Sequence, residues 1–355
     1  MGPSSSALLV AAALVVIAAG IKAAEDLMVP FLLSAFIATI AATPVFWLKK
    51  RKVPEVLAIC LVMLGIVIVL MGIAALIAHS GTAFTQRLPF YQERLTHIIA
   101  DVVAWLLPLG VDVSTDALMS YFDPGTALVM AGNTLSRLGG VLSDGFLILL
   151  TVIFILAEAS SFPRKLSETL ANPEQSLPHF NRFAINVNRY IAIKTTVSLA
   201  TGITVSVLLA LLGIDFPVLW GLLAFLLNYI PTIGSIIAAV PAVLLALIQL
   251  GPGAALIAAG GYAALNIIMG SIVEPRFMGR GLGLSTLVVF LSLVLWGWLL
   301  GPVGMLLSVP LTMTAKIALE ANPNTQWLAH LLGPQHDYEE ELPVREPAVS
   351  GESGQ

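Results

Sequence analysis

The sequence predicts an all-α polytopic membrane protein. Its 355 residues are 58% hydrophobic and only 11% charged, whereas soluble domains carry roughly 25% charged residues. The mean hydropathy is +0.94. The apolar residues form long continuous runs, which excludes a β-barrel because barrel strands alternate apolar and polar positions. We expect about six long spanning helices, two Pro/Gly-broken helical hairpins and an amphipathic helical external insert.

The first three spans are expected at about residues 6–21, 27–48 and 56–78. Directly after the second span, residues 49–52 (Lys-Lys-Arg-Lys) form the densest basic cluster in the chain. Basic residues beside a span stay on the cytoplasmic side of the membrane. This places the N-terminus inside and the short polar corner at residues 22–26 outside.

After the third span, apolar residues recur at alternating steps of four and three: Phe84, Leu88, Tyr91, Leu95, Ile98, Val102 and Trp105. Charged and amide side chains occupy the other faces, so this stretch predicts an amphipathic helix. The helix could lie on the bilayer, cover the spans, or form a seam between subunits through its heptad-like spacing. Packing against neighbouring helices of its own fold is the simplest interpretation.

A fourth span at about residues 141–157 and a fifth at 195–212 flank a linker that carries several basic residues. That composition fits the cytoplasmic side. We expect Arg189 and Lys194, near the entry to the fifth span, to extend to the lipid headgroups. A contact of these side chains with substrate or lipid is the less favoured alternative.

The rest of the chain is organised around residues 216–273, which contain no Asp, Glu, Lys or Arg. This stretch is broken at residues 228–235 by a proline and a glycine, then continues into an uninterrupted run at 254–273. A last apolar stretch, 284–315, is broken at 301–304 (Gly-Pro-Val-Gly). Unpaired backbone groups in hydrocarbon cost several kcal/mol each, so both breaks must lie inside protein or line a cavity.

Each broken stretch forms either two full spans or one re-entrant hairpin, and in both cases the chain returns to the side it left. If both are re-entrant, the first enters from outside and the second from inside. Gly/Pro-interrupted segments in corresponding positions point to the binding site of a transporter. The alternative is that these residues only kink ordinary helices or let helices approach closely.

The candidate substrate- or ion-binding residues are the polar and helix-breaking residues at these depths: Asn228, Tyr229, Pro231, Thr232, Gly234, Ser235, Asn266, Glu274, Gly301, Pro302 and Gly304. Amides and hydroxyls can bind a polyhydroxylated solute, or coordinate Na⁺ together with carbonyls freed at helix breaks. Glu274 is the only carboxylate in this half close enough to the core to carry a proton or neutralise a cation. A salt bridge of Glu274 with Arg276 or Arg280 is an equally favoured role.

Other function classes find little support. The sequence has no GxxxxGK[ST] loop for nucleotides and no HExxH or GxSxG motif. The net charge of −4 gives no reason to expect nucleic acid. Cys60 is the single cysteine, so no intrachain disulfide forms. We therefore expect no enzymatic activity, no metal centre and no cofactor, apart from Na⁺ or H⁺ as a coupling ion.

Three motifs together resemble one known family. They are residues 228–234 (Asn-Tyr-Ile-Pro-Thr-Ile-Gly) followed by 241–247, residues 274–284 (from Glu-Pro-Arg-Phe-Met-Gly), and residues 296–310 (from Trp-Gly-Trp-Leu-Leu-Gly-Pro). They are similar to the AI-2E, or autoinducer-2 exporter, family of bacterial inner-membrane permeases. The resemblance implies a homo-oligomeric secondary transporter that uses no ATP. Some members are associated with export of autoinducer-2 and others with Na⁺(Li⁺)/H⁺ antiport.

The first functional hypothesis is therefore an exporter of a small polar solute, driven by an ion gradient, in which the two breaks meet near the midplane of the bilayer. The alternatives are a cation/proton antiporter with Glu274 as proton carrier, and a non-transporting membrane scaffold. The expected partners are a small polar solute or cation, membrane lipid and further copies of the chain, with no nucleic acid and no nucleotide. Both termini are expected in the cytoplasm.

The expected division of the chain has five parts. Residues 1–79 hold three spans, 80–140 the external amphipathic insert, 141–194 the fourth span and its linker, 195–320 the transport core with both broken hairpins, and 321–355 a disordered cytoplasmic tail.

Overall fold

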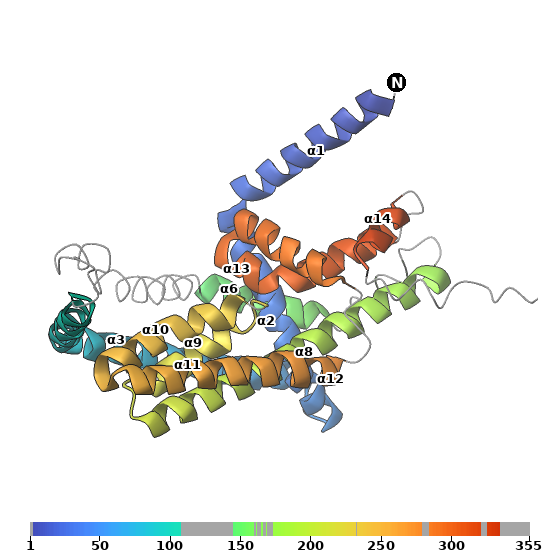
Figure 1. The fold of residues 1–355 in the computed structure, drawn as a ribbon. Coiled ribbons are helices and arrows are strands. Elements are labelled where there is room, and N and C mark those ends of the chain that lie inside the picture. Colours follow the sequence, from blue (N-terminus) through green and yellow to red (C-terminus); the bar gives the residue numbers. More distant parts are fainter. Residues whose placement is uncertain are drawn as a thin grey trace, which may run out of the picture.

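The computed structural model describes residues 3–107, 145–159, 161, 165, 168, 173–231, 233–278, 284–320 and 325–333. Within these ranges the chain is helical and contains no β-strand. The helices are α1 (Pro3–Ala23), α2 (Glu25–Lys50), α3 (Glu55–Leu106), α6 (Gly145–Ala159), α8 (Pro173–Leu212), α9 (Pro217–Leu227), α10 (Ile233–Leu250), α11 (Pro252–Asn266), the π-helix η2 (Ile267–Val273), α12 (Glu274–Met278), α13 (Thr286–Glu320) and α14 (Gln326–Leu331) (Figure 1).

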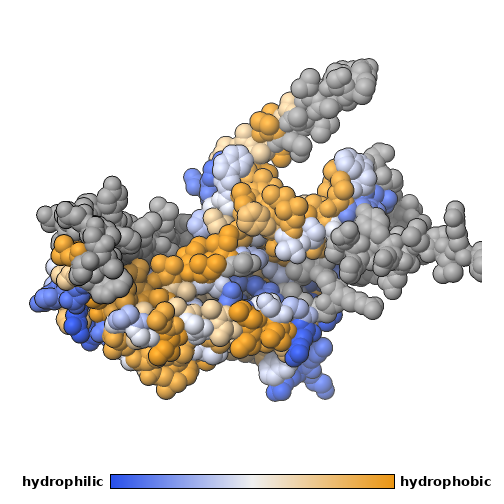
Figure 2. Space-filling view, viewed as in Figure 1, coloured by the Kyte–Doolittle hydropathy of each residue, from blue (hydrophilic) through white to orange (hydrophobic). Residues whose placement is uncertain are grey.

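Six helical segments of the described chain are long and apolar enough to cross a membrane. They are Glu25–Lys50, Glu55–Asp101, Ala184–Leu212, Ile233–Leu250, Pro252–Phe277 and Thr286–Glu320. The helices α6 and α9 are apolar but shorter. Hydrophobic residues cover much of the face that α10 and α11 present, whereas hydrophilic residues gather towards the extremities (Figure 2). The predicted class, an all-α polytopic membrane protein, is confirmed.

Helix α3 is one continuous helix of 52 residues. It contains both the expected third span and the amphipathic stretch, so the expected boundary at residues 79/80 lies inside it. The seam of the amphipathic stretch packs against the protein's own core, because Tyr91 and Leu95 are buried in a cluster with residues of α8 to α11. Of the four interpretations of this stretch, the structure shows packing within the fold. The expected insert beyond residue 107 lies outside the described residues.

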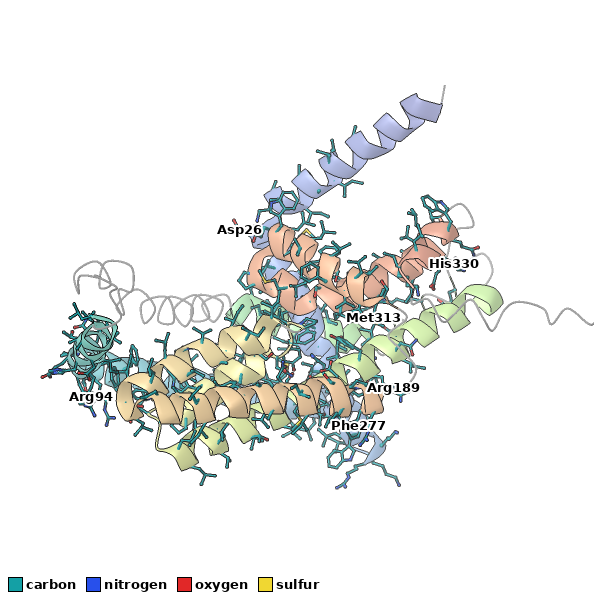
Figure 3. All side chains as sticks on the ribbon, in the orientation of Figure 1. Asp26, Arg94, Arg189, Phe277, Met313 and His330 are labelled. Carbon is teal, nitrogen blue, oxygen red and sulfur yellow. The ribbon has the colours of Figure 1, made fainter. Side chains whose placement is uncertain are left out.

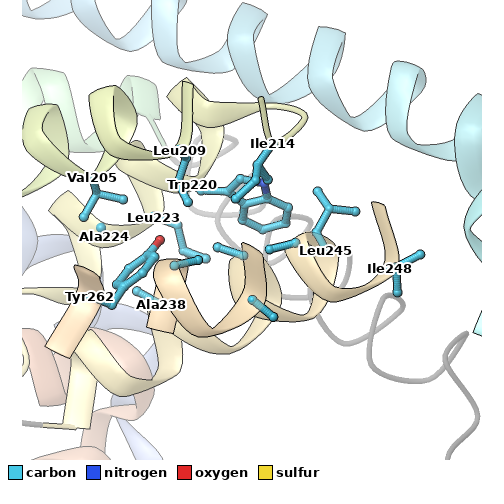
Figure 4. Packing of buried hydrophobic residues seen from close by; sticks show 14 of the residues in the cluster. Val205, Leu209, Ile214, Trp220, Leu223, Ala224, Ala238, Leu245, Ile248 and Tyr262 are labelled. Carbon is cyan, nitrogen blue, oxygen red and sulfur yellow. The ribbon is translucent and has the colours of Figure 1, made fainter. Parts of the chain in front are cut away.

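The main hydrophobic core is formed by α8, α9, α10 and α11, with Trp220, Leu209 and Leu245 fully buried (Figure 4). Helices α8 and α9 approach closely at two glycines. A Cβ on Gly202 would lie 2.7 Å from the carbonyl oxygen of Gly221, and one on Gly221 would lie 2.5 Å from that of Gly202. Small residues of this kind let helix backbones meet directly.

An arginine lies towards each end of this bundle. Arg189 of α8 and Phe277 of α12 lie towards one end, and Arg94 of α3 lies at the opposite end (Figure 3). In the expected tail, α14 packs back on the bundle, because the Ser285 amide donates to the Leu332 carbonyl at 3.0 Å and Ala329 is buried. The rest of that tail lies outside the described residues, and its disorder stays a prediction.

Candidate functional site

The first helix break is a closed turn between α9 and α10. The amides of Asn228, Ile230 and Gly234 donate to carbonyls of Ala224, Leu227 and Ile230, respectively, so the backbone satisfies much of its own polarity. A Cβ on Gly234 would lie 1.8 Å from the Leu227 carbonyl oxygen. No residue with a side chain fits there without a shift of the backbone. Thr232, a predicted site residue in this turn, lies outside the described residues.

Side chains of this turn reach across to α8. The Asn228 side-chain amide donates to Ser198 Oγ at 2.9 Å, and the Tyr229 hydroxyl donates to Thr195 Oγ1 at 2.8 Å. Ser198 is completely buried. Pro231, half-buried, forms the apex of the turn. The polar groups of the break are therefore sheltered inside the protein, as the sequence predicted for a break within an apolar run.

At the start of α10, Ser235 turns towards the opposite neighbour, α11. Its hydroxyl donates to Asn266 Oδ1 at 2.9 Å. Both residues line a groove of about 460 Å³ between α10 and α11, together with Tyr262. The remaining described lining is aliphatic, so among the described residues the polar groups of the groove gather where Ser235 and Asn266 meet.

Glu274 lies where the π-helix η2 gives way to α12. Its carboxylate oxygens lie 2.8 and 2.9 Å from Lys194 Nζ of α8. The Lys194 side chain is only 5% exposed, so the expectation that it extends to the headgroups was wrong. Among the described residues, the basic partner of Glu274 is thus Lys194 and not Arg276, which is exposed; Arg280 lies outside the described residues. Single-turn π-helices are frequent at functional sites.

One face of α8 collects these contacts. We call Lys194, Thr195, Ser198 and Thr201 the α8 polar stripe. Its members are spaced by one to three residues and all are buried or half-buried, so they share a face of the helix. The stripe contacts the first break through Thr195 and Ser198, and α12 through Lys194. Sequence reasoning missed Thr195, Ser198 and Thr201 as site residues; their three-residue spacing in an apolar helix was the available signal.

The second break lies inside α13, where Gly301 has φ 61° and ψ −149°. A Cβ on Gly304 would lie 2.0 Å from the Trp296 carbonyl oxygen, so this turn is as tight as the first. Pro302 is exposed. The arms of the hairpin are joined by a hydrogen bond from Trp296 Nε1 to Thr312 Oγ1 at 3.0 Å.

The structure brings most of the predicted site residues together and separates the rest. Asn228, Tyr229 and Glu274 contact the α8 polar stripe, and Ser235 and Asn266 pair beside it. Gly301 instead lies next to α2, because a Cβ on it would lie 3.2 Å from Glu25 Oε1. Residues of the two hairpins nevertheless pack in the same hydrophobic cluster. Tyr229 belongs to one hydrophobic cluster with Leu307 and Val309 of α13, and its ring meets that of Phe36 edge to face at 5.6 Å.

Comparison with known proteins decides the family. Residues 11–324 match the profile described as AI-2E family transporter. The chain belongs to the AI-2E transporter family. Its similarity to the AI-2 transport protein TqsA of Escherichia coli is 44% identity over 322 residues, 90% of this chain and 93% of that protein. A putative transport protein of Haemophilus influenzae is 43% identical over 92% of this chain and 96% of its own length.

Further AI-2E relatives are more distant, such as the putative transport protein YhhT of Escherichia coli, which is 38% identical over 92% of this chain and 94% of its own length. The family and these names identify the chain as a multi-pass membrane protein of a transporter family. These relatives are named for transport in general or for AI-2. Their names therefore do not identify the solute, the direction of transport or the driving gradient of this chain.

Proposed function

We propose that this AI-2E family member exports a small, neutral, polar solute such as autoinducer-2 across the bacterial cytoplasmic membrane, driven by an ion gradient. The solute site lies between the first helix break, the α8 polar stripe and α11. One observation carries the proposal: the side chains of the break point to a neighbouring helix beside a groove, and their donors and acceptors are amides and hydroxyls.

The chemistry of these groups favours a neutral guest. Asn228, Ser235 and Asn266 are half-buried, so a solute hydroxyl can exchange with their present partners. Amide and hydroxyl groups at a few fixed positions of a largely apolar pocket give orientation and specificity. The relative named as an AI-2 transport protein supports the choice of autoinducer-2 as the first solute to test.

Antiport of Na⁺ or Li⁺ against H⁺ is the second candidate, and the Lys194–Glu274 pair is the observation that favours it. A proton on Glu274 would release Lys194, which gives a buried carboxylate the means to respond to a proton gradient. Against this, the pair is already neutral, so a cation that binds Glu274 must displace the ammonium group of Lys194. The same pair can couple solute export to protons without binding a metal cation.

The proposed transport cycle exposes the site first to one side and then to the other. Broken helices at repeat-like positions support such alternating access. Helix α9 has 11 residues and is about 17 Å long, little more than half of the hydrocarbon thickness of about 30 Å, which supports a re-entrant first hairpin. Cytoplasmic termini and homo-oligomeric assembly remain predictions.

Flux in proteoliposomes tests the proposal. Purified protein is reconstituted and the movement of autoinducer-2 is measured under imposed Na⁺ and H⁺ gradients. We expect gradient-dependent flux in the wild type and loss of flux in Asn228→Ala. Thr204→Ala is the matched control, because that hydroxyl belongs to α8 but donates only to its own helix, to the Ala200 carbonyl at 2.7 Å. Wild-type flux in Asn228→Ala would contradict the proposed site.

A further inference from the structure

Tyr262 of α11 has a buried hydroxyl without a protein partner. The residue is 6% exposed. Among the described residues, its hydroxyl and that of Ser308 are the two buried side-chain polar atoms with no hydrogen bond in the protein. Buried polar groups are nearly always paired, so an exception calls for a ligand or a bound water. Figure 4 shows the Tyr262 ring extending from α11 towards Val205 of α8 and Ala224 of α9.

A small cavity adjoins this hydroxyl. Its volume is about 10 Å³, and Tyr262, Thr201, Ser235 and Asn266 line it together with aliphatic side chains. Three of these residues, Tyr262, Ser235 and Asn266, also line the groove between α10 and α11. They therefore form a polar partition between the wide groove and the small inner cavity. A cavity of roughly 10–15 Å³ holds one water molecule or a group of that size.

The hydrogen-bonding groups that line the cavity determine which chemical group can bind in it. The hydroxyl of Tyr262 needs an acceptor. Thr201 Oγ1 gives its proton to the Val197 carbonyl at 2.9 Å, so its oxygen offers a lone pair to the cavity, whereas Ser235 Oγ gives its proton to Asn266 Oδ1. An oxygen that accepts from Tyr262 and donates to Thr201 satisfies both of these groups. Water and an alcohol hydroxyl meet this requirement.

A cation does not match the same walls. Among the described residues, the polar lining of the cavity is made of neutral hydroxyl and amide groups, with no carboxylate. The nearest carboxylate along the helix, Glu274, is already neutralised by Lys194. A cation in this cavity would lose its hydration without gaining an opposite charge, which is unfavourable in a low-dielectric interior.

We infer that Tyr262, Thr201, Ser235 and Asn266 form an internal site for a single neutral hydroxyl group, supplied either by a bound water or by a hydroxyl of the transported solute. The inference deepens the proposed function, on which it rests for the solute as a source of the hydroxyl. It adds Tyr262 and Thr201 to the candidate binding residues and assigns neutral polyhydroxylated compounds as the substrate class.

Tyrosine ¹³C NMR tests the site without measuring transport. The full chain has six tyrosines, so labelling at Cζ gives few signals, and the one lost in Tyr262→Phe is that of Tyr262. The labelled protein in detergent is titrated with autoinducer-2, with erythritol and with NaCl. We expect the Tyr262 signal to shift saturably with autoinducer-2 or erythritol and not with NaCl, which would identify a solute hydroxyl.

A resident water gives a different signature. The Tyr262 signal then lies in the hydrogen-bonded range without added solute, does not move in the titrations and changes on transfer from H₂O to D₂O. This outcome also supports the site. A saturable shift caused by NaCl overturns the inference in favour of a cation, and a signal outside the hydrogen-bonded range that nothing moves overturns it in favour of an empty void.

Two further variants complete the test. Thr201→Val keeps the side-chain volume and removes an acceptor, so we expect solute binding about five- to tenfold weaker, or loss of the water signature. Ser308→Ala removes the other unpartnered buried hydroxyl, which does not line the cavity, and should leave the Tyr262 signal unchanged. If the Tyr262 signal shifts saturably but the reconstituted protein transports no solute, the hydroxyl site stands and the proposed function is wrong. If the protein transports solute but Tyr262 gives no sign of a bound hydroxyl, the proposed function stands and the hydroxyl site is wrong.

Discussion

Lys194 of α8 and Glu274 of α12, 80 residues apart in the chain, form a largely buried ion pair. The ammonium nitrogen lies 2.8 and 2.9 Å from the two carboxylate oxygens, and the two side chains are 5% and 18% exposed. The pair joins α8 to α12 beside the candidate site. Its charges cancel locally, which is why the surrounding amides and hydroxyls decide the chemistry of the guest.

Removal of one partner of this pair should destabilise the protein more than removal of both. Lys194→Met leaves a buried carboxylate without compensation, with an expected cost of about 3–5 kcal/mol. The double variant Lys194→Met/Glu274→Gln should recover most of that loss. The measurement is the free energy of unfolding of each variant in detergent. A double variant as unstable as the sum of both single variants would show that the two side chains do not interact.

The two tight turns predict that the cost in stability of a glycine-to-alanine substitution differs sharply between glycines. Gly234→Ala places a methyl group against the Leu227 carbonyl, and Gly304→Ala places one against the Trp296 carbonyl. We expect each to cost about 3 kcal/mol and to reduce flux. Gly253→Ala is the control, because nothing lies within 4 Å of its added Cβ. Equal stability of all three variants would indicate that the two breaks are not held in this conformation.

A polar junction fastens α3 to the corner between α8 and α9. The carboxylate of Asp215 accepts hydrogen bonds from Arg87 and from the Tyr91 hydroxyl, the latter at 2.7 Å. Its amide donates to Gln249 Oε1 at 3.0 Å. Asp215→Ala leaves the Tyr91 hydroxyl without this acceptor, so we expect a loss of about 1–3 kcal/mol. Amide hydrogen exchange over residues 84–101 should also become faster.

Arg87→Ala is the companion variant for this junction. The Arg87 side chain is 56% exposed, so its pairing is screened by solvent, and we expect little change in stability or exchange. Because Asp215→Ala removes the ion pair as well, an effect of Arg87→Ala as large as that of Asp215→Ala would show that the ion pair, rather than the buried hydroxyl, holds α3 in place.

Orientation in the membrane can be tested with single cysteines. In a Cys60→Ser background, Lys50→Cys should react with a membrane-impermeant maleimide only from the cytoplasmic side, and Gly253→Cys only from the outside. Lys50 is exposed, and a Cβ on Gly253 meets open space, so neither change disturbs packing. Labelling of both positions from the same side would contradict the expected number of crossings between them.

The helix breaks were predictable because proline and glycine act locally. Pro231 with Gly234, and Gly301 with Pro302, interrupt apolar runs, and their backbone needs shelter whatever the rest of the fold does. The continuity of α3 was not evident, because the change from apolar to amphipathic composition near residue 80 resembles a new element. No helix-breaking pair occurs there, so the helix continues.

The α8 polar stripe illustrates what local patterns leave open. Thr195 and Thr201 donate to carbonyls of their own helix, a role that many serines and threonines of membrane helices share. Only the tertiary arrangement reveals which of them also receive a donor or line a cavity. In the same way, the burial of Lys194 depends on a carboxylate 80 residues away. Its position at the end of an apolar run predicted instead that its side chain extends to the lipid headgroups.

The glycine contact between α8 and α9 has a mechanical consequence. Where Gly202 and Gly221 meet, the two backbones are in direct contact, and the side chains of Ser206 and Phe225 fill the space beside them, which leaves little room for sliding or rolling. We therefore expect α8 and α9 to move together as one rigid body in any conformational change. The parts that yield have to be sought elsewhere, such as where α10 and α11 border the groove.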